Sequence, residues 1–225
     1  MCGRFALRRL PQQMLLDLKI EDPPDWEPRY NVAPTQTVAI VRERNAAREL
    51  ALVHWGLLPP WAEDPRAGAR MINARGETVD TKPAFREAFQ RRRCLVLADG
   101  YYEWEAIGRR KQPYLIALPA DQPFAMAGLW ERWYGQGEAK LDPPLESCTI
   151  ITTEANAQTS GVHDRMPVIL DDQARVRWLA DDSSAAHQSL LKPWEGEMTV
   201  TKVHDYVNNA RHEGPACVEV LRELF

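Results

Sequence analysis

The second residue of the chain carries the most distinctive chemistry in the sequence. Initiator methionine is removed when a small residue follows it, so we expect Cys2 to become the first residue. Its α-amine and its thiol, with pKa values of about 8 and about 8.5, would then sit on adjacent carbons. Such a 1,2-aminothiol condenses with an aldehyde to an imine and closes a five-membered thiazolidine ring. It can also act as an N-terminal nucleophile that uses its own amine as the base, and an incidental cysteine at a frayed terminus is the alternative.

A second group of candidate residues lies in and around the segment 72–78. Asn73 can both donate and accept hydrogen bonds, which suits it to hold a terminal amine or a sugar oxygen. Arg75 can contact a phosphate with two parallel hydrogen bonds, and Trp61 can offer a stacking face to an unpaired base. A turn asparagine, a surface arginine and a core tryptophan are the structural alternatives, and each is the better reading for its residue taken alone.

Glu103 is a candidate general acid and base because it lies among aromatic residues, with Trp104 directly after it. Burial raises the pKa of a carboxyl group toward the range useful for proton transfer. A salt-bridged glutamate in a strand is the structural alternative.

His163 is a candidate proton shuttle or oxyanion-binding residue, since it lies beside Asp164 and Arg165 in a turn before an apolar strand. The remaining histidines are expected to be structural or exposed; they are His54, His187, His204 and His212. No pair of histidines has metal-ligand spacing, so the sequence predicts no metal site, and the chemistry expected of these residues needs no organic cofactor.

Length and charge bound the class of protein. The 225 residues are enough for a core that needs no disulfide or metal, and the four separated cysteines are expected to be reduced thiols in a cytoplasmic protein, with Cys94 and Cys148 buried. The net charge of −4 is not that of a general nucleic-acid binder. Residues 1–112, however, carry +4 and residues 113–225 carry −8, and 22 of the 28 basic residues are arginine, which suits phosphate.

Many strands and few helices must position these residues. We expect one domain over residues 1–225, of class α+β, with a mixed, strongly curved or barrel-like sheet. Apolar patterns predict strands over Val38–Arg42, Glu49–Leu57, Cys94–Ala98, Tyr101–Glu105, Tyr114–Leu118, Phe124–Trp130, Cys148–Thr153, Met166–Leu170 and Met198–Val203. They predict helices over Pro11–Ile20, Pro83–Gln90, Asp172–Ala180 (capped by Asp171) and Ala185–Leu191, whereas 21–34 and 59–74 read as irregular and Asp99-Gly100 as a turn.

Taken together, these segments resemble the SRAP (SOS response-associated peptidase) family of abasic-site processing proteins. The matching segments follow the family's order over nearly the whole chain: 1–5, 28–35, 55–59, 73–75, 82–85, 93–96, 98–104, 163–167 and 207–208. Each segment is weak alone, and the combination is highly specific. Gly76 and Leu97 depart from the common residues at their positions, and neither is one of the candidate catalytic residues.

The resemblance implies a mixed, bifurcated and partly closed (barrel-like) β-sheet flanked by short helices, and a role for each candidate. It implies that Cys2 forms the thiazolidine, that Asn73 positions the terminal amine, that Glu103 is the acid and base, and that His163 assists opening of the deoxyribose. It further implies that a DNA channel is lined by Arg4, Arg75 and Trp104, and more loosely by Trp61.

The activity that the resemblance implies is a covalent crosslink to an abasic site in single-stranded DNA, which protects the lesion during the DNA damage response. This is lyase-like Schiff-base chemistry, and we expect a cytoplasmic monomer that associates with the nucleoid on damaged DNA. Two alternatives stay open. One is an N-terminal-nucleophile cysteine peptidase, limited in its modest form to removal of Met1; the other is a non-covalent reader of modified or unpaired DNA, which would not need Cys2.

Overall fold

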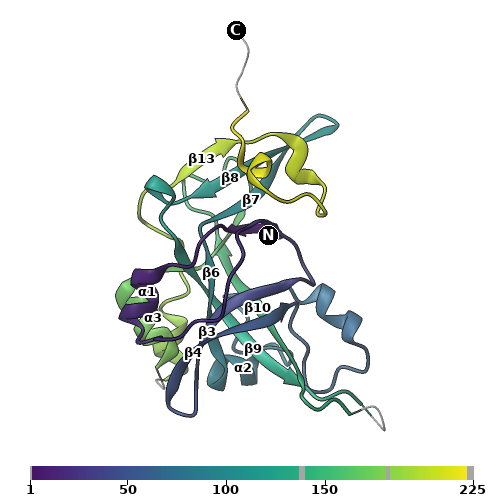
Figure 1. The fold of residues 1–225 in the computed structure, drawn as a ribbon, viewed down its shortest axis with the longest axis vertical. Coiled ribbons are helices and arrows are strands. Elements are labelled where there is room, and N and C mark those ends of the chain that lie inside the picture. Colours follow the sequence, from purple (N-terminus) through teal and green to yellow (C-terminus); the bar gives the residue numbers. More distant parts are fainter. Residues whose placement is uncertain (1, 137–139, 181–182, 222–225) are drawn as a thin grey trace.

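Strands dominate the computed structural model, which describes residues 2–136, 140–180 and 183–221 (Figure 1). The strands are β1 (Phe5–Leu7), β2 (Arg29–Val32), β3 (Thr37–Arg44), β4 (Ala47–Trp55), β5 (Asn73–Arg75), β6 (Arg93–Ala98), β7 (Gly100–Ile107), β8 (Arg110–Ala117), β9 (Phe124–Trp133), β10 (Leu145–Glu154), β11 (Arg165–Pro167), β12 (Ile169–Leu170) and β13 (Thr199–Lys202). The α-helices are α1 (Gln12–Asp17), α2 (Arg86–Arg91), α3 (Asp172–Leu179) and α4 (Ser184–Gln188). Short 3₁₀ helices cover η1 (Pro65–Arg70), η2 (Pro119–Asp121), η3 (Asp205–Asn208) and η4 (Pro215–Val218). Among the described residues, no helix is long and apolar enough to cross a membrane.

The strands form two sheets. The smaller sheet has the order β13-β8-β7-β1-β2 with antiparallel pairing throughout. The larger has the order β11-β10-β4-β3-β6-β9-β12, and an additional pairing of β9 with β10 closes five of its strands into a ring. Strand β10 pairs with β4 and then β5 along one edge, both in parallel, and with β9 and then β11 along the other. The predicted α+β class with a mixed, bifurcated and partly closed sheet is therefore confirmed.

Both faces of the central strands are buried, which explains their nearly continuous apolar sequences. Successive side chains of a strand point to opposite faces, so β3 divides its residues between two clusters. Val38 and Ile40 join a cluster that includes Phe5 of β1, at the junction with the smaller sheet. Ala39 and Val41 join a second cluster. Its helical members are Met14 and Leu15 of α1, Ala88 and Phe89 of α2, and Trp178 and Leu179 of α3.

Most predicted elements are present, with shifted ends. The predicted hairpin is the antiparallel pair β3 and β4, and the Asp171 carboxylate caps α3 by accepting the Ala174 N–H at 2.7 Å. The expected strand over Met166–Leu170 is broken at Val168. Its N–H donates to the Ile151 carbonyl and its carbonyl accepts from the Ala127 N–H, so it bridges β10 and β9.

The two stretches expected to be irregular contain regular structure. Residues 21–34 include β2, and 59–74 include η1 and the start of β5. Each of these strands has only three or four residues and forms through pairing with a distant partner, β1 for β2 and β10 for β5. A strand of that length has no readable alternation of its own, so the sequence pattern could not predict it.

Asp99 and Gly100 turn the chain from one sheet into the other, since β6 belongs to the larger sheet and β7 to the smaller. The Asp99 carboxylate accepts the Arg8 N–H at 2.6 Å and the Arg8 Nε–H at 3.0 Å, which fixes the passage next to β1. A Cβ at position 100 would lie 2.7 Å from a methyl group of Leu115, so glycine permits the close approach of β8. This passage carries Glu103 of β7 to the seam between the two sheets.

Candidate functional site

Four predicted catalytic residues meet at the seam between the two sheets. Cys2 precedes β1, which pairs with β7, and β7 carries Glu103. Asn73 begins β5 and His163 lies two residues before β11; both strands flank the end of β10. The Asn73 amide Nδ2 donates to the Cys2 carbonyl at 2.8 Å, which ties the chain start to the larger sheet.

Cys2 is completely buried, so it is not the frayed terminal residue of the structural alternative. Burial raises the pKa of its thiol, and the nearby charge of Glu103 raises it further, while a hydrogen bond from the Arg4 N–H opposes the shift. The thiol is therefore protonated at neutral pH. To react as a nucleophile, it must give its proton to a base within the site.

Glu103 is the group with the titration range to be that base. Only 4% of its surface is exposed, and this burial raises its pKa to about 7, with the charge of Asp164 acting in the same direction. A carboxyl group with a pKa of about 7 is present in both protonation states at neutral pH, so it can donate a proton in one step and accept one in another.

Asn73 is held by the parallel pairing of β5 with β10, where it lies opposite Ile150. Its Nδ2 binds the Cys2 carbonyl, and its Oδ1 is buried with no hydrogen-bond partner among the described residues. An unsatisfied buried carbonyl is costly, so this oxygen is a ready acceptor for an N–H or O–H group that enters the site.

His163 is a neutral histidine in its surroundings. Burial lowers its pKa, although the Asp164 carboxylate 2.8 Å from Nδ1 opposes the shift. Nδ1 also lies 3.0 Å from the Arg165 backbone nitrogen, so the imidazole is held at the start of β11 by contacts on one ring nitrogen. Because Asp164 also raises the pKa of Glu103, this histidine turn and Glu103 lie in one electrostatic environment.

Two of the four predicted DNA-binding residues lie together. The Arg4 guanidinium is 5.7 Å from the centre of the Trp104 ring, and it donates to Asn31 Oδ1 at 2.7 Å and to the Val207 carbonyl at 3.0 Å. Trp104 Nε1 donates to Asn208 Oδ1 at 2.6 Å. A guanidinium group and an aromatic ring are therefore held in place close to the site, since Arg4 follows Cys2 by two positions in the sequence and Trp104 follows Glu103 directly.

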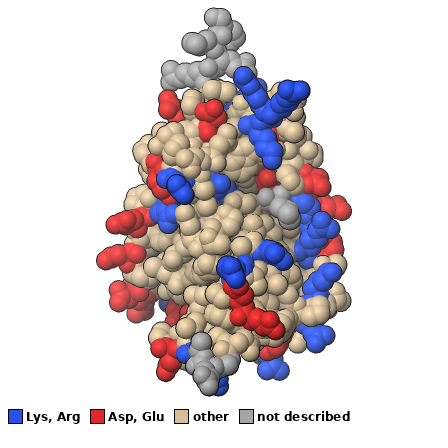
Figure 2. All heavy atoms as spheres, turned by 90° about the vertical axis from the view of Figure 1, so that its right-hand side faces the viewer, with Lys and Arg blue, Asp and Glu red and all other residues tan. Residues whose placement is uncertain are grey.

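The other two predicted DNA-binding residues are exposed. Arg75 follows Asn73 by two positions in β5, so both side chains lie on the same face of that strand. Trp61 is 54% exposed in the turn before η1, which corrects the alternative of a core tryptophan. Figure 2 shows basic side chains over the upper and right-hand parts of one face and mainly acidic ones along its left margin, an unevenness that the net charge conceals.

Sequence reasoning missed three residues that shape the site. Asn31 is completely buried, and its Nδ2 donates to the carbonyls of Val207, Asn209 and His212, so it anchors the C-terminal segment beside Arg4. The buried phenol of Tyr101 is coupled electrostatically to Cys2 and Glu103, and Asp164 adjusts the pKa of Glu103. None has a local signature, although all three lie within or beside the segments that carry the family resemblance.

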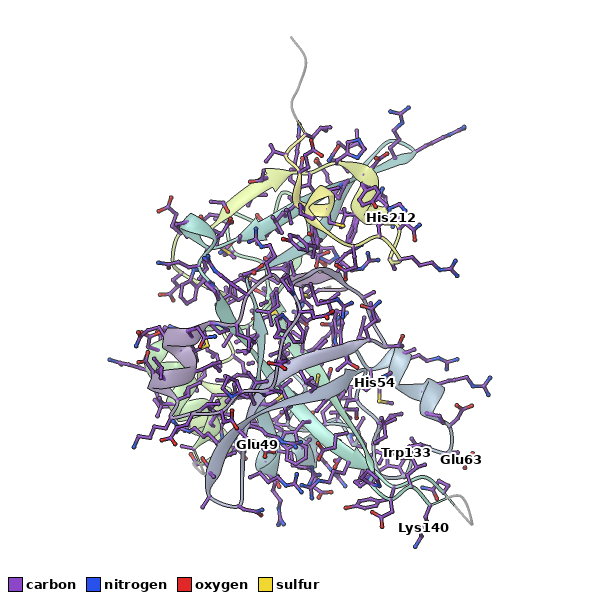
Figure 3. The ribbon with its side chains drawn as sticks, viewed as in Figure 1. Glu49, His54, Glu63, Trp133, Lys140 and His212 are labelled. Carbon is purple, nitrogen blue, oxygen red and sulfur yellow. The ribbon has the colours of Figure 1, made fainter. Side chains whose placement is uncertain are left out.

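The other histidines and cysteines lie outside this cluster. His54 on β4 and His212 in the C-terminal segment are well separated in Figure 3, and His212 stacks on Tyr206 at 3.9 Å. Cys94 and Cys148 are completely buried, as expected. In the part of the chain that the structure describes, no three His, Cys, Asp or Glu side chains lie close enough to hold a metal ion.

Comparison with known proteins identifies the family. The family model "SOS response associated peptidase (SRAP)" matches residues 1–210. The abasic site processing protein YoqW of Bacillus subtilis is 37% identical over 97% of this chain and 99% of its own length, and YedK of Escherichia coli is 34% identical over 84% of each. A crystal structure of a Bacteroides thetaiotaomicron protein, 26% identical, superposes with a TM-score of 0.86 over 98% of this chain and all of that one. The chain therefore belongs to the SRAP family.

Proposed function

We propose that this protein processes abasic sites in single-stranded DNA by forming a thiazolidine between Cys2 and the ring-opened deoxyribose. One observation carries the proposal: the buried Cys2, held through its carbonyl by Asn73, lies beside a glutamate whose pKa is raised to about 7. The names of the relatives, which are abasic site processing proteins, support the choice of substrate.

The chemistry balances without a metal, an oxidant or an organic cofactor. After Met1 is removed, the Cys2 amine attacks the aldehyde carbon, and protonated Glu103 gives its proton to the resulting hydroxyl group, which leaves as water. The Glu103 carboxylate then takes the thiol proton, and the sulfur attacks the iminium carbon to close the ring. The products are one thiazolidine and one water, and Glu103 ends protonated, as it began.

The neighbouring polar groups serve the steps before ring closure. Asn73 orients the terminal residue through its carbonyl, and its buried Oδ1 accepts a hydrogen bond from the amine or from a sugar hydroxyl. His163, whose neutral form is favoured because burial lowers its pKa, assists opening of the deoxyribose ring. An aldehyde exists only in the open form of the sugar, so this step controls how much substrate can react.

Single-stranded DNA suits the surroundings of the site. An abasic nucleotide has no base to stack, so extruding its sugar costs little. Arg4 and Arg75 would hold phosphates, and Trp104 and Trp61 would stack on neighbouring bases. The crosslink would shield the lesion during the DNA damage response, with the protein acting as a monomer.

The raised pKa of the Cys2 thiol favours aldehyde chemistry over general peptide cleavage. Cysteine peptidases attack with a thiolate whose pKa is lowered by a neighbouring positive charge, whereas here burial and Glu103 both raise it. An iminium ion formed on the same residue supplies that missing positive charge. Peptidase activity, if present, is limited to removal of Met1, and a non-covalent reader would bind DNA equally well without Cys2.

A denaturing gel tests the proposal. The protein is incubated with a single-stranded oligonucleotide that carries one abasic site, and the band that survives denaturation is quantified. We expect a covalent band for the wild type and for Cys148→Ser, which removes another buried thiol, and none for Cys2→Ser. No band for the wild type, or an undiminished band for Cys2→Ser, would overturn the proposal.

A further inference from the structure

We propose that Asn156 is the positioning residue for His163, and that it acts on the ring-opening step through the turn that carries this histidine. The inference rests on the proposed function and adds a residue that the chemistry above does not use. It is drawn from one hydrogen-bond network between the end of β10 and the start of β11.

The Asn156 side chain builds the turn from within. Its Oδ1 accepts the Gln158 N–H at 3.1 Å, the Thr159 N–H at 3.0 Å and the Thr159 hydroxyl at 3.0 Å. Its backbone carbonyl accepts the N–H groups of Thr159 and Ser160 at 3.2 and 3.0 Å. After the end of β10, backbone N–H groups no longer pair with a neighbouring strand. The Asn156 side chain accepts hydrogen bonds from them instead.

The next layer of the same network ends on His163. The Thr159 carbonyl, fixed by Asn156, accepts the N–H groups of Val162 at 2.9 Å and of His163 at 3.2 Å. The Ala155 N–H donates to the Asp164 carbonyl at 3.0 Å, which closes the base of the loop around the histidine. The backbone of His163 is thus two hydrogen bonds from Asn156 Oδ1.

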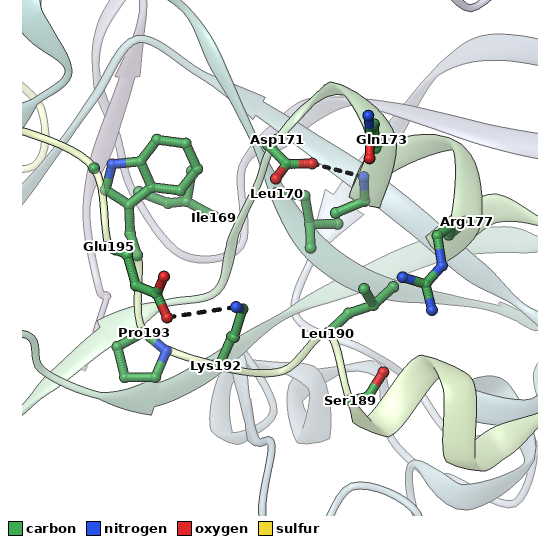
Figure 4. A pocket seen from close by; sticks show the side chains of 13 residues that line it. Ile169, Leu170, Asp171, Gln173, Arg177, Ser189, Leu190, Lys192, Pro193 and Glu195 are labelled. Carbon is green, nitrogen blue, oxygen red and sulfur yellow. Dashed lines mark hydrogen bonds and ion pairs between the residues drawn. The ribbon is translucent and has the colours of Figure 1, made fainter.

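The other end of the Asn156 amide fastens the turn to the scaffold. Nδ2 donates to the Trp194 carbonyl at 2.9 Å and contacts the Met198 sulfur at 3.6 Å. Trp194 lies between Pro193 and Glu195 on the wall of a surface hollow of about 360 Å³, which Figure 4 shows beside α3. Gln158 adds a parallel link, since its side chain bonds the Gly196 carbonyl and the Met198 N–H.

The turn also reaches the reacting cysteine. Thr159 is 2% exposed and lies near the buried Tyr101 phenol, whose pKa is raised by burial and further by the charges of Cys2 and Glu103. The same turn therefore forms a wall of the site beside Tyr101. If this wall served stability alone, loss of Asn156 would slow every step of the reaction alike.

The experiment separates the two roles by substrate. Crosslinking rates are measured for wild type, His163→Ala and Asn156→Ala on a natural abasic site and on an oligonucleotide bearing an aliphatic aldehyde that cannot form a ring. On the natural site we expect Asn156→Ala to be slower by about 10-fold, the effect of a displaced reacting group. On the open aldehyde, which needs no ring opening, both variants should react within about 2-fold of wild type.

Three further measurements complete the test. Asn156→Asp keeps the acceptor oxygen of the turn but loses the donor to the Trp194 carbonyl, so it should recover only part of the rate. Gln13→Ala, which removes an exposed side-chain amide from α1, is the control and should leave the rate unchanged. In the His163→Ala background, Asn156→Ala should cost nothing more. Equal slowing on both substrates, or an additive loss in the double variant, would refute the proposal. If the wild type forms an adduct with neither substrate, the proposed function itself is refuted.

Discussion

Glu103 is buried and Glu146 is partly exposed, and their environments shift their pKa values in opposite directions. Burial raises the pKa of Glu103 to about 7, and Asp164 adds to the shift. Burial also raises the pKa of Glu146, but hydrogen bonds and charge from Arg42 and Arg132 outweigh it, and the net shift is downward. Arg42 lies 2.7 Å from Glu146 and stacks 4.1 Å from the centre of the Trp130 ring.

The comparison distinguishes a carboxylate that holds strands together from a carboxyl group that can transfer a proton. A carboxylate bound by guanidinium groups stays ionised at all ordinary pH values and holds β10 to β3 and β9. A carboxyl group buried beside a thiol and a second carboxylate keeps its proton near neutrality and can transfer it. Paired variants are therefore expected to differ in crosslinking rate, in free energy of unfolding and in binding of single-stranded DNA.

The largest difference is expected in the crosslinking rate. Glu103→Gln should form adduct slower by about 100-fold, the usual contribution of a general acid and base, whereas Glu146→Gln should react as wild type. Release of preformed wild-type adduct should quicken as the pH falls through about 7, because protonated Glu103 supplies the proton to the departing sulfur. In Glu103→Gln that pH dependence should be absent. Time courses on denaturing gels measure both rates, and an unchanged rate in Glu103→Gln would remove this residue from the mechanism.

The free energy of unfolding should change in opposite directions. The raised pKa of Glu103 means that the folded protein loses stability as the pH rises from the unfolded value of about 4.5 to about 7. Glu103→Gln should therefore be more stable than wild type at about pH 8, by about 1–3 kcal/mol, and nearly equal to it at about pH 5.

Glu146 provides the opposite case. Its lowered pKa means that it stabilises the fold above its unfolded pKa, and this stability disappears as the pH falls through the folded value. Because Glu146 is partly exposed, Glu146→Gln should cost no more than about 1 kcal/mol at about pH 8. Urea unfolding at both pH values measures these changes, and a shift of the same sign in the two variants would contradict the comparison.

The smallest effect is expected at the exposed rim of the site. In a Cys2→Ala background, which cannot crosslink, Arg75→Ala should weaken binding of single-stranded DNA a few-fold and lower the salt dependence by about 0.7, one phosphate contact. Arg91→Ala on α2, also an exposed arginine, is the control and should change neither. Fluorescence anisotropy at several salt concentrations measures both quantities. An unchanged salt slope for Arg75→Ala would exclude that contact.

The long strands were predictable and the short ones were not. Cys94–Ala98 and Val38–Arg42 are apolar because both faces of β6 and β3 are buried, and that pattern is visible locally. Strands β2 and β5 form because they pair with distant strands, so their three or four residues show no apolar–polar alternation of their own. The local sequence pattern therefore could not predict that Asn73 lies on a strand beside Cys2.

The candidate site was predictable in its residues and not in its layout. The resemblance pointed to Cys2, Asn73, Glu103 and His163, and the two-sheet topology brings them to one seam, while their roles stay predictions. Complete burial of Cys2 was not foreseen, because it depends on sheet closure around the chain start. Asn31 and Asn156 act through backbone carbonyls and turns, which have no sequence signature apart from the amide itself.

Counting the free thiols in the purified adduct tests the central claim most directly. A thiazolidine and an imine have the same mass, protein plus DNA less one water, but only the thiazolidine uses the sulfur. The adduct is denatured without a reductant and treated with an alkylating agent. Its intact mass is then measured, and a proteolytic digest identifies the N-terminal peptide. The chain has four cysteines, so the account predicts three alkylated thiols, a peptide that begins at Cys2, and no Met1. Four alkylated thiols, or an adduct on protein that retains Met1, would contradict it.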